Sequence, residues 1–236
     1  MSEHMALENL TVLDLTRVLA GPFCTMMLAD MGANVIKIEV PKGGDDTRGY
    51  PPFRAKNLNG ERESVYFANI NRNKKGITLN LKAPEGKEIF KELVKKADVV
   101  VENYRPGVMD KLGLGYDVLK EINPRIIYAA VSGFGCYGPY HLRPGYDILA
   151  QAMGGMMSIT GAKGGEPTRA GSALGDILGG LHVTIGILAA VNARTITGKG
   201  QRVDVSLMDS MIAATENTAL KYIETGNIPA PMGNRY

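Results

Sequence analysis

The opening of the chain alternates short apolar runs with a helical pattern, and this alternation constrains the fold more than any other feature. Leu10–Thr16 and Asn34–Glu39 are rich in apolar and β-branched residues, as buried strands are. Between them, Phe23–Met31 has helical spacing, and Pro22 stands where a first helical residue is expected. A strand, a helix and a second strand in this order predict a parallel sheet with a ligand crevice at the carboxyl ends of its strands.

The same alternation continues along the rest of the chain. Further strands are expected at residues 76–81, 98–103, 125–131 and 201–207. Helices are expected at 84–96, 146–157, 177–196 and 209–225, and a helix broken around Gly113 and Gly115 at 109–122. Residues 41–73 are polar and contain two prolines in succession, so a long loop is expected there. The predicted fold class is α/β, with a parallel, Rossmann-like open sheet flanked by helices.

Composition and charge exclude several functional classes. The 236 residues carry 27 basic and 24 acidic side chains, a net charge of +3, which is too balanced to indicate nucleic-acid binding but compatible with a phosphorylated small ligand. The two cysteines lack metal-ligand spacing and indicate a reducing compartment. No secretory leader opens the chain, and the longest apolar stretch carries His182 and Thr184. We therefore expect a cytoplasmic protein that neither spans a membrane nor binds a metal.

One glycine motif invites a different interpretation. Gly133–Gly138 matches the G-x-G-x-x-G pattern of dinucleotide sites after a predicted strand, but that pattern must open a helix. Pro139 and Pro144 break any helix in the following residues. The motif therefore predicts a loop, and no tightly bound cofactor is expected.

Asp176 is the strongest candidate for a catalytic residue. It stands near the start of the predicted helix 177–196, where free backbone N–H groups and the helix dipole favour an ionised carboxylate. Gly175, Gly179 and Gly180 leave room beside it for a bulky substrate, so that the carboxylate could attack an acyl carbon. A purely structural role as a helix N-cap is the alternative.

A series of short motifs in fixed order identifies a family. The motifs are Ala20–Pro22, Leu28–Glu39, Gly44–Arg48, Leu79–Lys82, Ala97–Asp98, Glu102–Asn103, Pro124–Arg125, Ser132–Gly135, Tyr146–Asp147 and Gly175–Asp176. Together they resemble the class III CoA-transferases, the CaiB/BaiF type that acts with formyl-CoA or acetyl-CoA and oxalate. The resemblance runs from about Leu7 to Tyr236.

The resemblance implies an enzyme that moves CoA from an acyl-CoA to a small carboxylic acid through a covalent thioester on Asp176, with CoA as substrate and not as a bound cofactor. The CoA contacts that it implies are Leu19, Ala20, Leu79, Asn80, Lys82, Asn103, Tyr104, Arg105, Lys111, Pro144, Tyr146 and Asp147. Lys111 could instead be a solvated helix charge. Leu19 and Val40 depart from the glutamine and arginine of the oxalate-specific pattern, which leaves the acceptor acid open.

The resemblance also implies how the chain is organised. Residues 7–225 would form the CoA-binding and catalytic domain, 226–236 would begin a linker to a second domain absent from this chain, and the full-length family forms interlocked homodimers. Two alternatives are an α-methylacyl-CoA racemase and a non-catalytic CoA-binding subunit or fragment. Tyr146 stands where the racemase would need a histidine, which argues against proton abstraction.

Overall fold

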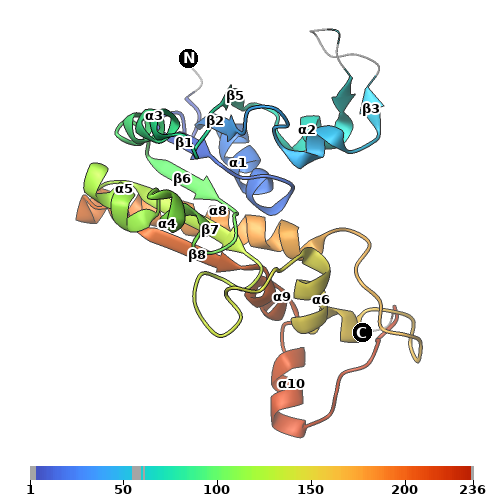
Figure 1. The fold of residues 1–236 in the computed structure, drawn as a ribbon. Helices are drawn as coiled ribbons and strands as arrows, with labels where there is room; N and C mark the ends of the chain where they lie inside the picture. Colours follow the sequence, from blue (N-terminus) through green and yellow to red (C-terminus); the bar gives the residue numbers. More distant parts are fainter. Residues whose placement is uncertain (1–3, 55–59, 61, 235–236) are drawn as a thin grey trace.

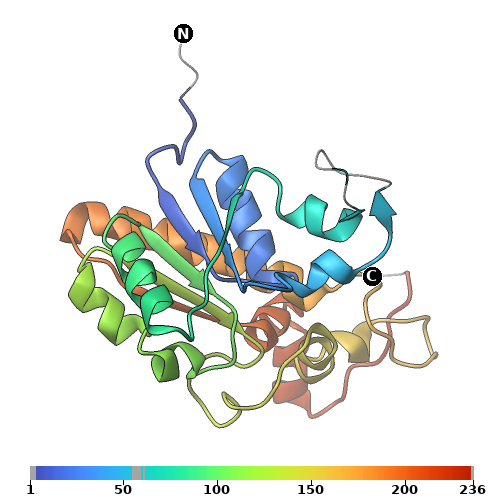
Figure 2. The same ribbon diagram turned by 45° about the horizontal axis from the view of Figure 1, so that its top comes forward.

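The computed structural model describes residues 4–54, 60 and 62–234. In this part of the chain, six parallel strands form one sheet in the order β5-β2-β1-β6-β7-β8 (Figures 1 and 2). The strands are β1 (Thr11–Asp14), β2 (Asn34–Glu39), β5 (Lys75–Thr78), β6 (Val99–Glu102), β7 (Ile127–Ser132) and β8 (Arg202–Ser206). The order reverses between β1 and β6, which is the arrangement of a doubly wound, Rossmann-like sheet. The predicted fold class is confirmed.

Alternating strand residues face two separate hydrophobic layers. Val12, Val99 and Val101 point to one face, where α1 (Ala20–Asp30) and α8 (Leu174–Thr197) pack. Leu13 and Val100 point to the other face, which is covered by α3 (Pro84–Val94), α4 (Val108–Leu112) and α5 (Tyr116–Ile122). Because both faces are covered, these strands read as continuous apolar runs in the sequence.

A second group of helices gathers beyond the carboxyl ends of the strands. It consists of α6 (Asp147–Met153), α7 (Met156–Ile159), α9 (Leu207–Ala214) and α10 (Thr218–Thr225). The predicted helix 146–157 divides into α6 and α7 because Gly155 adopts a φ of 85°. The predicted helix 209–225 was also wrong as a single element, since the chain leaves helical geometry at Glu216, where φ is 52°. The predicted linker 226–236 contains no helix or strand through residue 234, and its last two residues lie outside the described ranges.

Two of the other differences from the prediction concern the segments that follow β1 and β2. Helix α1 begins at Ala20, so Pro22 is its third residue and not its first; this position is still among those whose N–H has no partner within the helix. The segment predicted as a loop at 41–73 contains η1 (Asp46–Gly49), β3 (Phe53–Arg54), β4 (Glu63–Ser64) and α2 (Val65–Ile70). Residues 55–59 and 61 of that segment are outside the described part.

Helix α8 is the longest helix of the described residues, and by length and apolar composition alone it could cross a membrane. Its buried residues form one face that packs on α1, β7 and β8. Near its carboxyl end, the buried Arg194 forms an ion pair of 2.9 Å with Asp98. In this fold α8 is therefore a core helix that covers the sheet.

The Gly133–Gly138 motif forms a loop, as predicted. No helix begins after it until α6 at Asp147. Gly133 instead meets Gly145 so closely that a Cβ atom on Gly133 would lie 2.3 Å from the Gly145 Cα. The glycines therefore allow two backbone segments to cross, and they present no helix N-terminus to a pyrophosphate.

Candidate active site

A cavity of about 230 Å³ opens at the point where the strand order reverses. Its walls come from the segments that follow β1, β6, β7 and β8, together with residues 143–146 and Asp176 at the start of α8. In open α/β sheets this position, outside the carboxyl ends of the strands, is where ligands bind. The fold therefore brings distant segments of the sequence to one site.

Asp176 lies in the first turn of α8, partly buried, and lines this cavity. The prediction that the helix starts at Ile177 was wrong: it starts at Leu174, and Ala173 is the N-cap residue without a side-chain cap bond. Asp176 is therefore the third helical residue and does not cap the helix. Its carboxylate is left to face the cavity, which is what a nucleophile requires.

The capping group comes from a different helix. Asp147, the first residue of α6, accepts a hydrogen bond of 2.7 Å from the Gly175 N–H through Oδ1, and one of 2.8 Å from Gln151 Nε2 through Oδ2. Gln151 Oε1 in turn accepts from the Ala170 N–H at 2.8 Å. Asp147, predicted as a CoA contact, does not line the cavity, and its described contacts fix the start of α8.

The electrostatics of Asp176 differ from the expectation. The helix dipole was expected to favour the ionised carboxylate, but burial, and after it the charge of Asp147, raises the pKa of Asp176 to about 7. The loss of solvation is the larger of the two causes. Asp176 is consequently poised between its neutral and ionised forms near neutral pH.

Tyr66 is close enough to Asp176 for the charge of the carboxylate to act on its phenol, which the sequence did not indicate. It lies on α2, within the segment predicted as a loop, and is partly buried. Burial and the charge of Asp176 raise the pKa of its phenol, which therefore stays protonated and able to donate a hydrogen bond. No local pattern connects Tyr66 with a carboxylate more than 100 positions later, so only the fold could reveal the pair.

Most of the predicted CoA contacts meet in the cavity, and several do not. The residues that line it with Asp176 are Leu19, Ala20, Asn103, Tyr104, Arg105, Pro144 and Tyr146. Leu79 packs instead beside the hydrophobic layer of α3–α5, and Asn80 Oδ1 accepts a hydrogen bond from the Lys82 N–H. Lys82 and Lys111 are exposed, away from the residues that line the cavity. These four residues lie outside the cavity wall and could meet only a ligand that extends beyond it.

Three arginines give the cavity rim a positive charge. Arg17, Arg105 and Arg143 all line it. Arg17 is tied to Asp46 at 3.6 Å, and its guanidinium lies 5.9 Å from the centre of the Tyr104 ring. A guanidinium group can bind a phosphate through two parallel N–H···O hydrogen bonds. The rim thus suits an anionic ligand with phosphate groups, while the interior presents a carboxylate.

The site is thus a cavity at the carboxyl ends of the strands that combines a partly buried carboxylate, Asp176, with three arginines. Residues 7–236 match the model of CoA-transferase family III, and the chain belongs to this family.

Relatives with assigned activities support the same membership. An acyl-CoA transferase of Fusarium pseudograminearum is 50% identical over 228 residues, which cover 95% of this chain and 50% of the relative. The acetyl-CoA:oxalate CoA-transferase of Acetobacter aceti is 48% identical over 230 residues, covering 97% of this chain and 58% of the relative. This chain therefore spans between half and three fifths of the length of these two proteins.

Solved structures agree on the architecture. The crystal structure of a CaiB/BaiF family protein from Brucella suis superposes with a TM-score of 0.94 at 45% identity, covering 99% of this chain and 61% of that one. A second, Rv3272 from Mycobacterium tuberculosis, gives a TM-score of 0.84 at 34% identity, with 93% and 60% covered. The predicted family is confirmed, including the CaiB/BaiF type.

Proposed function

We propose that the protein transfers CoA from an acyl-CoA to a carboxylic acid, with Asp176 as the covalent nucleophile. The observation that carries the proposal is the position of Asp176: it is a partly buried carboxylate in a cavity with a basic rim, on a fold whose family is that of CoA-transferases. Relatives named as oxalate, mesaconate and glutarate CoA-transferases support a small acid as the acceptor.

The chemistry proceeds through balanced exchanges at one carboxylate. An oxygen of Asp176 attacks the thioester carbonyl and the C–S bond breaks. CoA departs as a thiolate, and a mixed anhydride of Asp176 and the donor acid is formed. The thiolate then attacks the aspartyl carbonyl and expels the donor acid, which leaves an aspartyl-CoA thioester. The acceptor carboxylate repeats these steps in reverse order and regenerates Asp176. Each step replaces one activated acyl bond by another, so the exchange needs no external energy source.

The surroundings of Asp176 suit these steps. Its pKa of about 7 makes it more basic than an ordinary aspartate, which strengthens it as a nucleophile once it is ionised. Apolar and aromatic residues such as Leu19, Leu207 and Tyr104 line the cavity and would limit water, which protects an anhydride from hydrolysis. The arginines of the rim would hold the phosphates of CoA outside the reacting centre.

The alternative thiol mechanism finds no support in the geometry. Cys136 is not among the residues that line the cavity. Burial, and after it the charge of Asp204, raises the pKa of its thiol to about 12, so hardly any thiolate forms at neutral pH. Cys24 is fully buried and its pKa is likewise raised, mainly by burial.

The proposal is tested by trapping the intermediate. The protein expressed from its complete gene is incubated with an acyl-CoA and then treated with hydroxylamine or borohydride, and its peptides are analysed by mass spectrometry. The expected result is a hydroxamate or a reduced side chain at Asp176, dependent on acyl-CoA. Modification at Cys136, or none in an enzyme that turns over, would refute the aspartyl route. A panel of oxalate, succinate, mesaconate, glutarate and itaconate would identify the acceptor.

A further inference from the structure

The segment Arg17–Leu19, which lines the cavity between β1 and α1, has an unfavourable backbone conformation. Val18 has a φ of 68°, in the left-handed region. A β-branched residue rarely occurs there, because its branched Cβ collides with the neighbouring backbone. Such a conformation persists only where the surroundings hold it, and outliers of this kind cluster at functional sites.

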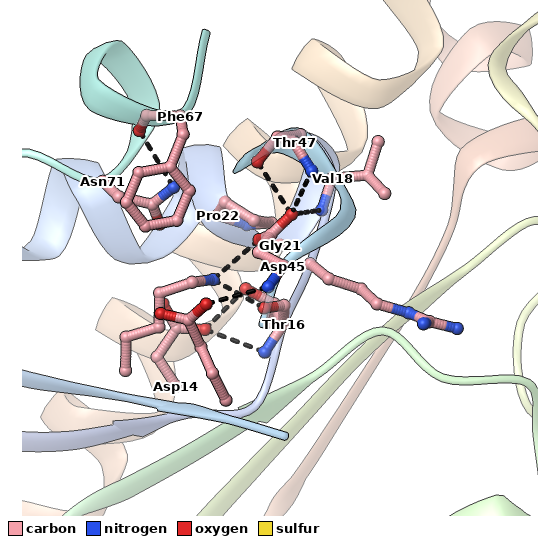
Figure 3. A network of polar contacts seen from close by, with 12 residues as sticks. Asp14, Thr16, Val18, Gly21, Pro22, Asp45, Thr47, Phe67 and Asn71 are labelled. Carbon is pink, nitrogen blue, oxygen red and sulfur yellow. Dashed lines mark hydrogen bonds and ion pairs between the residues drawn. The ribbon is translucent and has the colours of Figure 1, made fainter. Parts of the chain in front are cut away.

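Two buried charged residues, Asp45 and Lys37, form hydrogen bonds with the backbone at this segment. Asp45 Oδ1 accepts a hydrogen bond of 3.2 Å from the Val18 N–H (Figure 3). Lys37, on β2, donates from Nζ to the Thr16 carbonyl oxygen at 2.8 Å, and the same Nζ lies 2.9 Å from Asp45 Oδ2. The two members of this ion pair therefore bind the backbone on both sides of Arg17, at Thr16 and at Val18.

Asn103 holds Arg17 itself from the end of β6. The Arg17 N–H donates to Asn103 Oδ1 at 2.9 Å, and Asn103 Nδ2 donates to the Arg17 carbonyl oxygen at 2.7 Å. The Asn103 side chain therefore pairs with both polar groups of the Arg17 backbone. Side chains from three separate segments thus bind four successive polar groups of the Thr16–Val18 backbone.

The Lys37–Asp45 pair is almost completely buried, with side-chain exposures of 2% and 0%. Burial alone would raise the pKa of Asp45, but the Lys37 ammonium and the hydrogen bonds from Thr47 outweigh it. The pKa of Asp45 therefore lies below its usual value, and its carboxylate stays ionised. A buried ion pair adds little net stability compared with apolar residues of the same volume. Because the pair binds the backbone next to the strained Val18, its role is to hold that conformation.

The segment is also linked to the helix that carries Asp176. Helix α1 begins directly after Leu19, and Ala20 packs so tightly on α8 that a Cβ atom on Gly180 would lie 2.7 Å from the Ala20 carbonyl oxygen. Gly180 is one turn beyond Asp176. The position of Arg17–Leu19 and that of the carboxylate are thus fixed relative to each other.

We propose that Lys37 and Asp45 are positioning residues, which hold Arg17–Leu19 in the conformation that places the thioester of a bound acyl-CoA against Asp176. The proposal rests on the proposed function for its consequence, since it concerns the same cavity. It also predicts a property of the free protein, which is slow exchange of the Arg17 and Val18 amide hydrogens.

The test compares three variants of the protein expressed from its complete gene. Asp45→Asn removes the charge, and Lys37→Met combined with Asp45→Leu replaces the whole pair by apolar residues of similar volume. Asp98→Asn is the matched control, because Asp98 pairs with the buried Arg194 at 2.9 Å and lies just before β6, at the amino ends of the strands and not among the residues that line the cavity. Each variant is characterised by its melting temperature, by kcat and KM for CoA transfer, and by hydrogen exchange of the peptide containing residues 16–19.

In both variants of Asp45, kcat should fall by about 10- to 100-fold, because a small misplacement of reacting groups is costly. KM for the acyl-CoA should change by about threefold or less, and exchange at residues 16–19 should rise at least about tenfold. Asp98→Asn should lower the melting temperature while leaving kcat and that exchange unchanged.

A folded Lys37→Met, Asp45→Leu variant with the wild-type kcat and the wild-type exchange would overturn the proposal. An equal loss of kcat in Asp98→Asn would also overturn it, because the effect would then be general destabilisation. If the unaltered enzyme transfers no CoA, the proposed function fails, and the exchange measurement still decides whether the pair holds the segment.

Discussion

The carboxylate of Asp147 caps the helix that carries the candidate nucleophile: its Oδ1 accepts a hydrogen bond of 2.7 Å from the N–H of Gly175. The two residues are 28 positions apart and belong to α6 and α8. The same carboxylate helps to raise the pKa of Asp176. One side chain therefore fixes the start of the helix and also contributes, after burial, to the raised pKa of Asp176.

Asp147→Asn should separate these two effects. The amide oxygen can still accept from Gly175, whereas the amide nitrogen cannot accept from Gln151 Nε2, so the fold should be retained with some loss of stability. The negative charge beside Asp176 is removed. The pKa of Asp176 should fall, although not to its ordinary value, because burial is the larger cause of its rise. The acidic limb of the pH–rate profile should move to lower pH. Asp209→Asn, which changes an exposed carboxylate in α9, should leave the profile in place.

The rate of the unaltered enzyme should depend on pH through Asp176. Only the ionised carboxylate attacks, and its pKa is about 7. The value of kcat/KM should therefore rise between about pH 6 and pH 8 and level off above that range. Steady-state rates measured with a mixed buffer of constant ionic strength test this. A profile that is flat down to pH 5 would contradict the raised pKa.

Asp176→Asn should lose transfer activity and gain stability at alkaline pH. Loss of the nucleophile should lower kcat at least about 100-fold, and Asp176→Ala should behave in the same way. The folded-state pKa of Asp176, about 7, is above the unfolded value of roughly 3.9, so the native protein binds the proton more tightly. The stability of the unaltered protein should therefore fall as pH rises from about 4 to about 7.

That loss should be absent from Asp176→Asn. Melting temperatures of the two proteins should differ little near pH 4, and the variant should melt higher at pH 8. Retention of more than a few per cent of the activity by the folded variant would exclude Asp176 as the nucleophile.

Gly180→Ala should destabilise the protein through the contact between α1 and α8. The new Cβ would lie 2.7 Å from the backbone oxygen of Ala20, so the two helices must separate. We expect a loss of about 1 to 3 kcal/mol of unfolding free energy in urea titrations. Gly179→Ala is the matched control in the same helix, because its Cβ meets the tip of the Leu207 side chain, which can move. Equal losses would show that the backbone contact is unimportant.

The 236-residue chain should self-associate in solution. Three apolar side chains on and after α10 are largely exposed: Leu220 at 60%, Ile223 at 70% and Ile228 at 80%. Ile223 and Ile228 line an apolar groove of about 520 Å³, and Leu220 belongs to the same helix as Ile223. Such a surface favours association. Sedimentation over a concentration series should show dimers or larger species, and Ile223→Lys should reduce them. Val118→Lys, on α5 at another face, should not. A monomer at all concentrations would contradict the prediction.

Local patterns in the sequence were sufficient to predict the sheet and most of its helices. Strand β2 has the predicted bounds, Asn34–Glu39, and α3 begins at the predicted Pro84. These elements depend on apolar periodicity and on turn residues, which act within a few positions. The order of motifs was also sufficient to identify the family. The choice of Asp176 as nucleophile followed from its neighbours in the chain and from that resemblance, and it remains a prediction.

Only the tertiary structure revealed what surrounds Asp176. The cap from Asp147 and the electrostatic interaction with the phenol of Tyr66 join residues that no short pattern connects. The buried Lys37–Asp45 pair, which binds the Thr16–Val18 backbone, was likewise not indicated by a local pattern. The raised pKa of Asp176 was missed for a similar reason: a helix start can be inferred from sequence, whereas desolvation depends on which segments cover the carboxylate. The sequence thus determined the elements and the chemistry of the candidate residue. The packing of distant segments decided its protonation, its neighbours and the cavity that it faces.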